Sequence, residues 1–174
     1  TWKKFTASYL GESFLIPFLT PEEYFIFVGN TYGVSKPDIK KRLSDFSGFF
    51  GHNFEEVEHK YIRELSDGNK QKTGIVAALL TQPRLLIFDE PFKGLDPSSQ
   101  YLFKKMLQKQ NEISGTTIVL TSHDLVHVTE ISTRIAILED GAIIDDFNTG
   151  DYSLNNLQKY FSLQDDNSNL EKED

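Results

Sequence analysis

The sequence predicts an α/β fold with a parallel sheet at its core, and three runs of residues carry this prediction. The apolar run Leu85 to Phe88 leads directly into two acids, Asp89 and Glu90. An unbroken apolar run bounded by turn residues is typical of a strand buried on both faces in the middle of a parallel sheet. Two further runs, 5–10 and 116–120, have the composition of short strands, and helical patterns separate them from the first.

The composition limits the classes of protein to consider. A chain of 174 residues suffices for one domain with a real core, and a second domain is not expected. The net charge of -8 argues against a nucleic-acid binder, because affinity for the phosphate backbone rests on clustered Lys and Arg. Without cysteine there is no disulfide and no thiolate chemistry. No run has the apolar length to span a bilayer and no signal peptide opens the chain, so we expect any membrane association to come through a partner.

Helical patterns fill residues 19–65. Thr20 is an expected N-cap, with proline in the first turn and two acids after it. A second helix is expected to start near Ser35, and 49–50 and 53–63 favour further helical pieces. At least two thirds of the aromatic stripe in this stretch is expected in the core and a minority on a docking surface. The stripe consists of Tyr24, Phe25, Phe27, Phe46, Phe49, Phe50 and Phe54.

The loop at 65–69 is an expected anion site. Ser66 can cap a helix that starts near Asn69, and Gly68 lets the backbone approach a ligand closely. Free N–H groups at a helix N-terminus bind anions. Taken alone, a Ser-x-Gly cap is equally a common helix start without a ligand.

Polar side chains follow the predicted strands at their carboxyl ends. Asp89 and Glu90 end the central run, Glu12 comes just after run 5–10, and His123 lies just beyond run 116–120. A parallel sheet presents its ligand crevice at this edge, so two adjacent acids there need a cation or a proton. Each of these residues also has an alternative without a ligand. Asp89 and Glu90 would then cap a following helix or face solvent, Glu12 would be a loop carboxylate in solvent, and His123 would be structural.

The rest of the chain predicts a helix at 98–114, then a short helix and a hairpin within 131–146. Asp-Gly at 140–141 is a strong turn signal. A closing helix is expected at 152–163 and an acidic, disordered tail at 165–174. The residues of helix 98–114 expected to face inward are Leu102, Phe103, Met106 and Leu107.

The order and spacing of these motifs resemble the nucleotide-binding domain of ABC (ATP-binding cassette) ATPases. Leu-Ser-Asp-Gly-Asn at 65–69 is similar to the signature loop Leu-Ser-Gly-Gly-Gln, and the run ending in Asp89-Glu90 is similar to the Walker B strand. Gly-Leu-Asp at 94–96 resembles the D-loop, and His123 the switch histidine. The likeness covers about residues 6–150. It implies a P-loop NTPase-like parallel sheet core with an inserted helical subdomain at about 19–80, in a domain spanning 1–164.

The resemblance also implies roles for single residues. Asp89 would orient Mg²⁺, mostly through water, with Glu12 as a further ligand at the position of the Q-loop glutamine. Glu90 would polarise the attacking water, and His123 would hydrogen-bond the γ-phosphate. The residues that would act on ATP, held by a second ABC ATPase domain in a head-to-tail dimer, are Ser66, Asp67, Gly68, Asn69 and Asp96. Asp67 departs from the family pattern, since a carboxylate repels phosphate unless it points outward or meets the cation.

One family motif does not occur in the sequence. There is no G-x-x-x-x-G-K-S/T, the Walker A loop that holds the β- and γ-phosphates of ATP. The family places that loop before the position that Thr1 occupies, so we expect a partial domain, incomplete at the N-terminus, that binds ATP very weakly and hydrolyses none alone. We also expect its sheet to lack neighbours on one side, which leaves edges that invite pairing with another copy.

The leading hypothesis is the ATP-binding subunit of an ABC transporter, which couples ATP hydrolysis to transport and docks from the cytoplasm on a transmembrane permease. The sequence of residues 19–24, Leu-Thr-Pro-Glu-Glu-Tyr, most resembles that of ABC exporters. The alternative is a P-loop-less regulatory or docking module of an ABC complex, which retention of Asp89, Glu90 and His123 disfavours. An ABC protein of translation or DNA repair is disfavoured by the acidic balance, and no nucleic-acid partner is expected.

Overall fold

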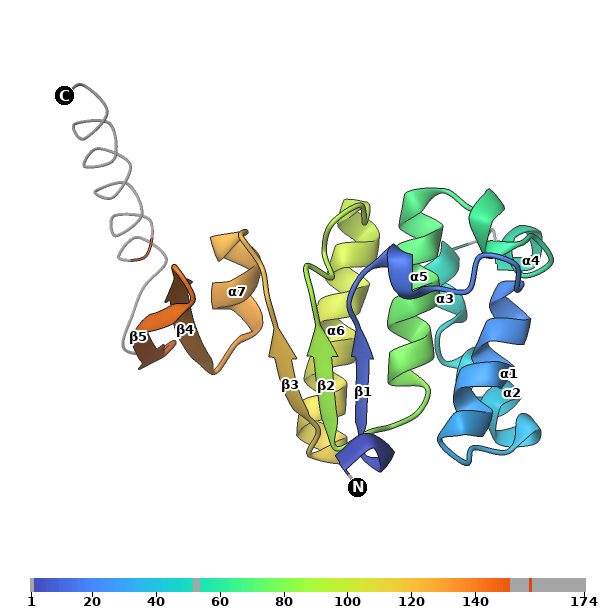
Figure 1. Ribbon diagram of the computed structural model, residues 1–174, viewed down its shortest axis with the longest axis horizontal. Coiled ribbons are helices and arrows are strands. Elements are labelled where there is room, and N and C mark those ends of the chain that lie inside the picture. Colours follow the sequence, from blue (N-terminus) through green and yellow to red (C-terminus); the bar gives the residue numbers. More distant parts are fainter. Residues whose placement is uncertain (1, 52–53, 151–156, 158–174) are drawn as a thin grey trace. The chain divides into compact units, whose positions relative to one another are not determined.

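The computed structural model describes residues 2–51, 54–150 and 157, and it divides into two compact units, Thr1–Thr121 and Ser122–Asp174 (Figure 1). The predicted closing helix at 152–163, apart from Leu157, and the predicted tail at 165–174 lie outside the described residues. In the described part of the chain, no helix combines the length and the apolar character needed to cross a membrane.

The first unit contains a parallel sheet of three strands. They are β1 (Thr6–Tyr9), β2 (Leu85–Phe88) and β3 (Thr117–Leu120), in the order β1-β2-β3. The last residues of the strands are in register, Tyr9 beside Phe88 and Phe88 beside Leu120. The prediction of an α/β fold with Leu85 to Phe88 in the middle of a parallel sheet is therefore confirmed. The register also brings the residues that follow the strands to one edge.

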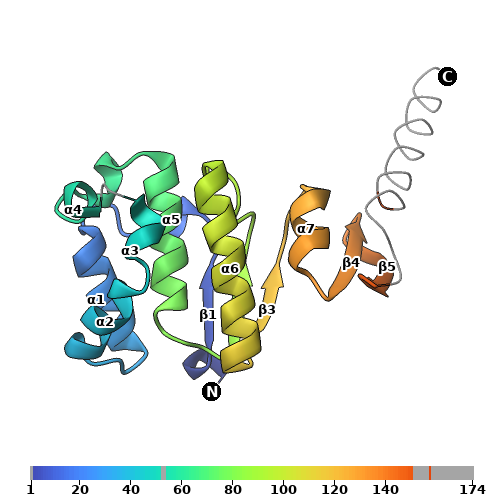
Figure 2. The same ribbon diagram turned by 180° about the vertical axis from the view of Figure 1, so that it is seen from behind.

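The central strand is buried on one face only, so the prediction of burial on both faces is wrong. Leu86 and Phe88 are buried, whereas Leu85 and Ile87 are half-buried. The helices α5 (Asp67–Leu79) and α6 (Pro97–Ser114) pack on the face of Leu86 and Phe88; α6 lies behind the sheet in Figure 1 and in front of it in Figure 2. No helix among the described residues of this unit covers the opposite face, where Val119 is 51% exposed.

An aromatic cluster joins the sheet to its helices. Phe103 of α6 is fully buried, and its ring centroid lies 5.5 Å from that of Phe88 in an edge-on arrangement. The centroid of Phe92, just after β2, lies 5.1 Å away, and that of Phe49 in α3 (Ser47–Phe50) 6.2 Å away. Offset and edge-on aromatic pairs of this kind add about 0.5–1.5 kcal/mol to the burial of their surface. The cluster fixes the segment after β2 against α6.

Local capping signals set the starts of the helices between β1 and α5. Thr20 caps α1 (Pro21–Thr31) in a capping box: its hydroxyl accepts from Glu23 N, and the Glu23 carboxylate accepts from Thr20 N. Ser35 caps α2 (Lys36–Ser44). Both predicted helix starts are confirmed. The shorter elements of this stretch are the 3-10 helices η2 (Glu12–Phe14) and η4 (Ile62–Glu64) and the helix α4 (Phe54–Val57); a further 3-10 helix, η1 (Trp2–Lys4), precedes β1.

Burial of the aromatic stripe follows the packing of these helices on α5. Four of its seven members are buried, Phe25, Phe46, Phe49 and Phe50. Tyr24 and Phe54 are half-buried, and Phe27 is 50% exposed.

Helix α6 buries a narrower stripe than the sequence predicts. Phe103 and Leu107, four residues apart, are buried, but Met106 is half-buried and Leu102 is 37% exposed. The prediction that Leu102 faces inward is wrong. Neighbouring helix positions differ by about 100° around the axis, and a helix that lies on only one sheet needs a single i, i+4 stripe.

The second unit consists of α7 (Leu125–Ile131) and an antiparallel hairpin of β4 (Arg134–Glu139) and β5 (Ala142–Asn148). The predicted hairpin is confirmed, and both turn residues, Asp140 and Gly141, have positive φ as a tight hairpin turn requires. The helix ends at Ile131 rather than beginning near it, because Asp124 caps it earlier. The small core of the second unit contains Ile135, Ile137 and Leu157, with Leu125, Val128 and Phe147 packed against them.

Candidate functional site

The carboxyl edge of the sheet holds Asp89 and Glu90 beside Thr121. The Thr121 hydroxyl donates to Asp89 Oδ1 at 2.5 Å and accepts from Glu90 N at 3.1 Å. Backbone bonds align the same edge, since Asp89 N donates to Tyr9 O and Thr121 N to Phe88 O. One threonine hydroxyl, just after β3, thus holds the Asp89 carboxylate and the backbone N–H of Glu90. A carboxylate has about four lone-pair positions, so Asp89 keeps acceptor capacity beyond this bond.

Glu90 has an unusual backbone conformation. Its φ is 46°, in the left-handed region that a residue with a Cβ occupies at a cost of roughly 1–2 kcal/mol. The turn is closed by Lys93 N, which donates to Glu90 O at 3.2 Å. Strained backbone of this kind persists where the surroundings hold it, and it is concentrated at functional sites.

The donor chemistry at Asp89 fits Mg²⁺. This ion takes one or two carboxylates and keeps several waters, so it does not need a cage of protein ligands. The described residues contain no group of three or more His, Asp or Glu side chains that could hold a metal. Glu12, the second predicted ligand, has its Oε2 3.2 Å from Lys70 Nζ. The structure therefore gives the Glu12 carboxylate a lysine as its partner.

The loop at 65–69 forms the N-terminus of α5. Ser66 is its N-cap, with the hydroxyl accepting from Asn69 N at 3.4 Å, so the predicted cap is confirmed and the helix begins at Asp67. The Asp67 side chain is 82% exposed and lies 3.2 Å from Lys70 Nζ. It points outward, which is the geometry in which its charge least opposes a phosphate at the helix N-terminus.

Two contacts join the start of α5 to the segment 94–96. A Cβ on Gly68 would lie 2.9 Å from Gly94 O, so the absence of a side chain at Gly68 allows this loop to pack within the chain. Lys72 Nζ lies 3.3 Å from Asp96 Oδ2, with the Lys72 side chain only 11% exposed. The start of α5 and the segment 94–96 are therefore packed against each other.

Asp96 is engaged as a helix cap. Its carboxylate accepts from Ser99 Oγ at 2.5 Å and from Ser99 N at 3.0 Å, at the start of α6. These bonds, with the nearby Lys72 ammonium, lower the pKa of Asp96 to about 2. Asp96 is therefore charged at neutral pH and anchors α6 to α5.

His123 lies in the second unit, exposed, between Ser122 and the Asp124 cap of α7. The Asp124 carboxylate accepts from Val126 N at 2.9 Å and His127 N at 3.2 Å. The other predicted site residues all lie in the first unit.

Sequence reasoning gave no role to Thr121 or to Gln71, which the structure brings to the acids. The signal for Thr121 is available in the strand register: Phe88 pairs with Leu120, so the next residues, Asp89 and Thr121, must be neighbours. Gln71 continues the signature pattern after Asn69, but that pattern does not indicate which groups its side chain contacts.

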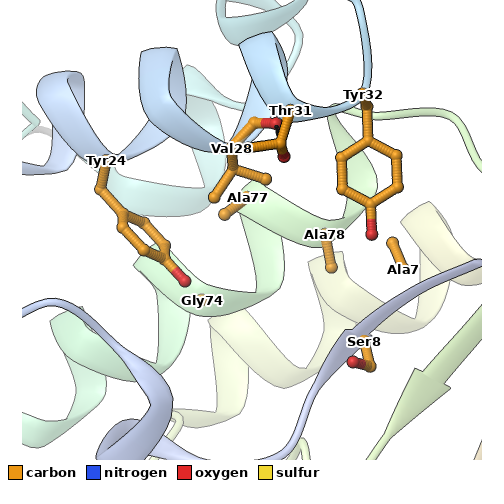
Figure 3. A pocket seen from close by; sticks show the side chains of 9 residues that line it. All are labelled: Ala7, Ser8, Tyr24, Val28, Thr31, Tyr32, Gly74, Ala77 and Ala78. Carbon is orange, nitrogen blue, oxygen red and sulfur yellow. Dashed lines mark hydrogen bonds between the residues drawn. The ribbon is translucent and has the colours of Figure 1, made fainter. Parts of the chain in front are cut away.

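A small cavity lies between α1, α5 and β1 (Figure 3). Its volume is about 170 Å³, and Tyr24 and Tyr32 of the α1 region point into it towards Gly74 and Ala78. The Tyr32 hydroxyl donates to Thr6 O at 2.7 Å. Burial raises the pKa of both tyrosines, so the residues that line the cavity carry no charge at neutral pH.

Comparison with known proteins identifies the family. Residues 21–128 match the family model described as "AAA domain, putative AbiEii toxin, Type IV TA system". The chain is 38% identical over 127 residues to an uncharacterized ABC transporter ATP-binding protein of Alkalihalophilus pseudofirmus, covering 73% of this chain and 46% of the relative. It is 34% identical over 123 residues to the methionine import ATP-binding protein MetN of Carboxydothermus hydrogenoformans, covering 71% and 36%. The chain thus spans less than half the length of these relatives.

A solved structure shares the fold over most of the chain. The dimeric, post-hydrolysis ATP-binding cassette MJ0796, bound to ADP and Pi, matches with a TM-score of 0.71 and 25% identity, over 83% of this chain and 62% of that one. The strands and helices of this chain are therefore arranged as in that cassette over most of the chain, in agreement with the sequence matches. Together with the acids aligned at the sheet edge, these matches show that the chain belongs to the family of ABC transporter ATP-binding proteins.

Proposed function

We propose that this chain provides the signature helix, the Walker B acids and the D-loop of an ABC-type ATPase, in which ATP binding and hydrolysis drive transport across a membrane. The observation that carries the proposal is the pair Asp89 and Glu90 at the carboxyl edge of a parallel sheet, where Thr121 bonds the Asp89 carboxylate and the Glu90 backbone N–H. Phosphoryl transfer to water needs a metal-binding acid, a group that orients the water and charge stabilisation, and little covalent chemistry.

Each site residue has a proposed task. Asp89 holds Mg²⁺, largely through water, and Glu90 polarises the water that attacks the γ-phosphate. His123 donates a hydrogen bond to that phosphate. The capped N-terminus of α5 presents its N–H groups to the γ-phosphate of ATP on a second ABC ATPase domain, in a head-to-tail dimer. The dimeric state and the bound ADP and Pi named for the MJ0796 cassette support this arrangement.

The groups that hold the β-phosphate must come from outside these 174 residues. The sequence contains no G-x-x-x-x-G-K-S/T, so it offers no P-loop lysine. We therefore propose that the 174-residue chain alone does not turn over ATP. An activity assay requires the complete product of the reading frame that contains this sequence.

The proposed partner is a transmembrane permease, on whose cytoplasmic side the ATPase docks. The names of the relatives, ABC transporter ATP-binding proteins, support this partner. The sequence of residues 19–24 favours export, whereas one relative is named for methionine import. Transport assays in both directions, in vesicles that contain the complex, decide between them.

The test is hydrolysis of Mg-ATP by the complete product and by its Glu90→Gln variant. Loss of the water-orienting carboxylate is expected to lower kcat by about 10²–10⁴-fold. Glu112→Gln makes the same chemical change on an exposed position of α6 and should leave kcat unchanged. A reading frame without a P-loop motif and a product without turnover would overturn the proposal in favour of a regulatory or docking module.

A further inference from the structure

Gln71 of α5 bridges the end of β1 and the segment that follows β2. Its Nε2 donates to Pro91 O at 2.9 Å and to Glu90 O at 3.3 Å. Its Oε1 accepts from the Tyr9 hydroxyl at 2.8 Å. One half-buried side chain therefore satisfies two consecutive carbonyls beside the acid of the site and one phenol on the neighbouring strand.

The chemistry of these partners fixes the orientation of the Gln71 amide. Carbonyl oxygens only accept hydrogen bonds, so the NH₂ group must face Glu90 O and Pro91 O. The amide oxygen then faces Tyr9, whose hydroxyl must donate. Burial raises the pKa of Tyr9, so this phenol keeps its proton at neutral pH.

The ring of Tyr9 is held equally firmly. It is 3% exposed, and it lies so close to α5 that a Cβ on Gly74 would stand 2.1 Å from its Cε2 atom. A buried ring seated on a helix backbone has little freedom to move its hydroxyl. Tyr9 therefore presents a fixed donor to Gln71.

These contacts act on the strained turn. The peptide of Glu90 is held at its nitrogen by Thr121 and at its carbonyl by Gln71 and Lys93. We propose that Gln71 is a positioning residue for Glu90: its amide fixes the carbonyls of Glu90 and Pro91 and thereby the place of the Glu90 carboxylate, and Tyr9 orients that amide. This inference rests on the proposed function of Glu90 as the group that polarises water.

The first test is steady-state hydrolysis of Mg-ATP by the complete product carrying Gln71→Leu, which keeps the size of the side chain and removes its donors and acceptor. We expect kcat to fall by about 10- to 100-fold, because small misplacements of a catalytic group cost this much, while KM for ATP changes by less than about twofold. The matched control is Gln108→Leu on α6. Parental kcat in Gln71→Leu, or an equal loss in both variants, would overturn the proposal.

A second measurement separates positioning from stability. If Gln71 acts through Glu90, adding Gln71→Leu to Glu90→Gln causes no further loss in single-turnover rate. A further loss of the same factor would mean an independent structural effect and would overturn the proposal.

A third measurement does not depend on turnover. In the ¹⁵N-labelled protein, the amide resonances of Glu90 and Lys93 should shift in Gln71→Leu and remain in place in Gln108→Leu. Tyr9→Phe, which keeps the ring on Gly74, should cause a smaller shift and provides the test if Gln71→Leu does not fold. Absence of turnover in the parent would defeat the proposed function, whereas unmoved Glu90 resonances would defeat the positioning role of Gln71.

Discussion

The ring of Tyr9 occupies the space that a side chain on Gly74 would need, with 2.1 Å between the ring and the position of a Cβ. Tyr9 ends β1 and Gly74 lies in the middle of α5, so this contact sets how closely the helix approaches the sheet. It also sets the position of the Tyr9 hydroxyl, and through it the orientation of Gln71.

Replacement of Gly74 by alanine should push β1 and α5 apart. We expect Gly74→Ala to lower the free energy of unfolding by about 1–3 kcal/mol, the usual cost of overpacking a core, measured by urea denaturation. Gly48→Ala in α3 is the matched control, since a Cβ there meets no atom within 4 Å. A better helix former should make that variant equal to or more stable than the parent by up to about 1 kcal/mol. Equal effects of the two substitutions would contradict the close contact.

Replacement of Thr121 by valine should loosen both acids. It removes the donor to Asp89 and the acceptor for Glu90 N, so we expect a loss of about 0.5–1.5 kcal/mol in unfolding free energy, because both bonds are exposed to solvent. Thr121→Ser keeps the hydroxyl and should remain near the parent. Thr117→Val changes an exposed position at the start of β3, the strand that ends just before Thr121, and serves as the control. If Thr121→Ser is as unstable as Thr121→Val, the hydroxyl is not what holds the acids.

The Asp96 carboxylate should make stability depend on pH. Its pKa of about 2 lies below the ordinary value of 3.8, because Ser99 and Lys72 favour the charged form. A lowered pKa gives stabilisation that is complete above 3.8 and is lost as the pH falls through about 2. Asp96→Asn retains a capping side chain and removes the charge. Its urea midpoint should lie below that of the parent at pH 7, and the difference should shrink over this acid range. A constant difference would exclude this origin.

Removal of the Thr20 hydroxyl should weaken the start of α1. The capping box loses one of its two reciprocal hydrogen bonds, so Thr20→Ala should cost about 1 kcal/mol in unfolding free energy. Thr20→Ser restores the acceptor and should recover most of this loss. A Thr20→Ser variant no more stable than Thr20→Ala would show that the bond to Glu23 N contributes nothing.

Local signals made the helix starts predictable from the sequence. Thr20, Ser35 and Ser66 each bond to a backbone N–H three residues later, so the information lies within one turn. The half-burial of Ile87 and the exposure of Leu102 were not predictable, because they depend on which face of the sheet the helices cover.

The site was predictable to the extent that it follows the strand pattern. Asp89 and Glu90 had to lie at the carboxyl edge once Leu85 to Phe88 formed a parallel strand, and their tasks in hydrolysis stay predictions. Gln71 was not predictable, since its partner Tyr9 is 62 positions away in sequence and no periodicity links the two. The exposure of Asp67 likewise depends on how the α5 N-terminus packs against Gly94.

The hydroxyl of Tyr32 has a consequence for how this sheet can grow. Along β1 the carbonyls of Phe5 and Tyr9 accept from the β2 side, so the carbonyl of Thr6, which points the opposite way, belongs to the outer edge of the strand. The Tyr32 hydroxyl occupies that carbonyl and holds the end of α1 against the edge. A strand from another segment or another molecule would have to displace this hydroxyl to pair with the Thr6 carbonyl. Pairing of a further strand along β1 therefore costs this hydrogen bond, which makes the outer edge of β1 an unfavourable place for the sheet to grow.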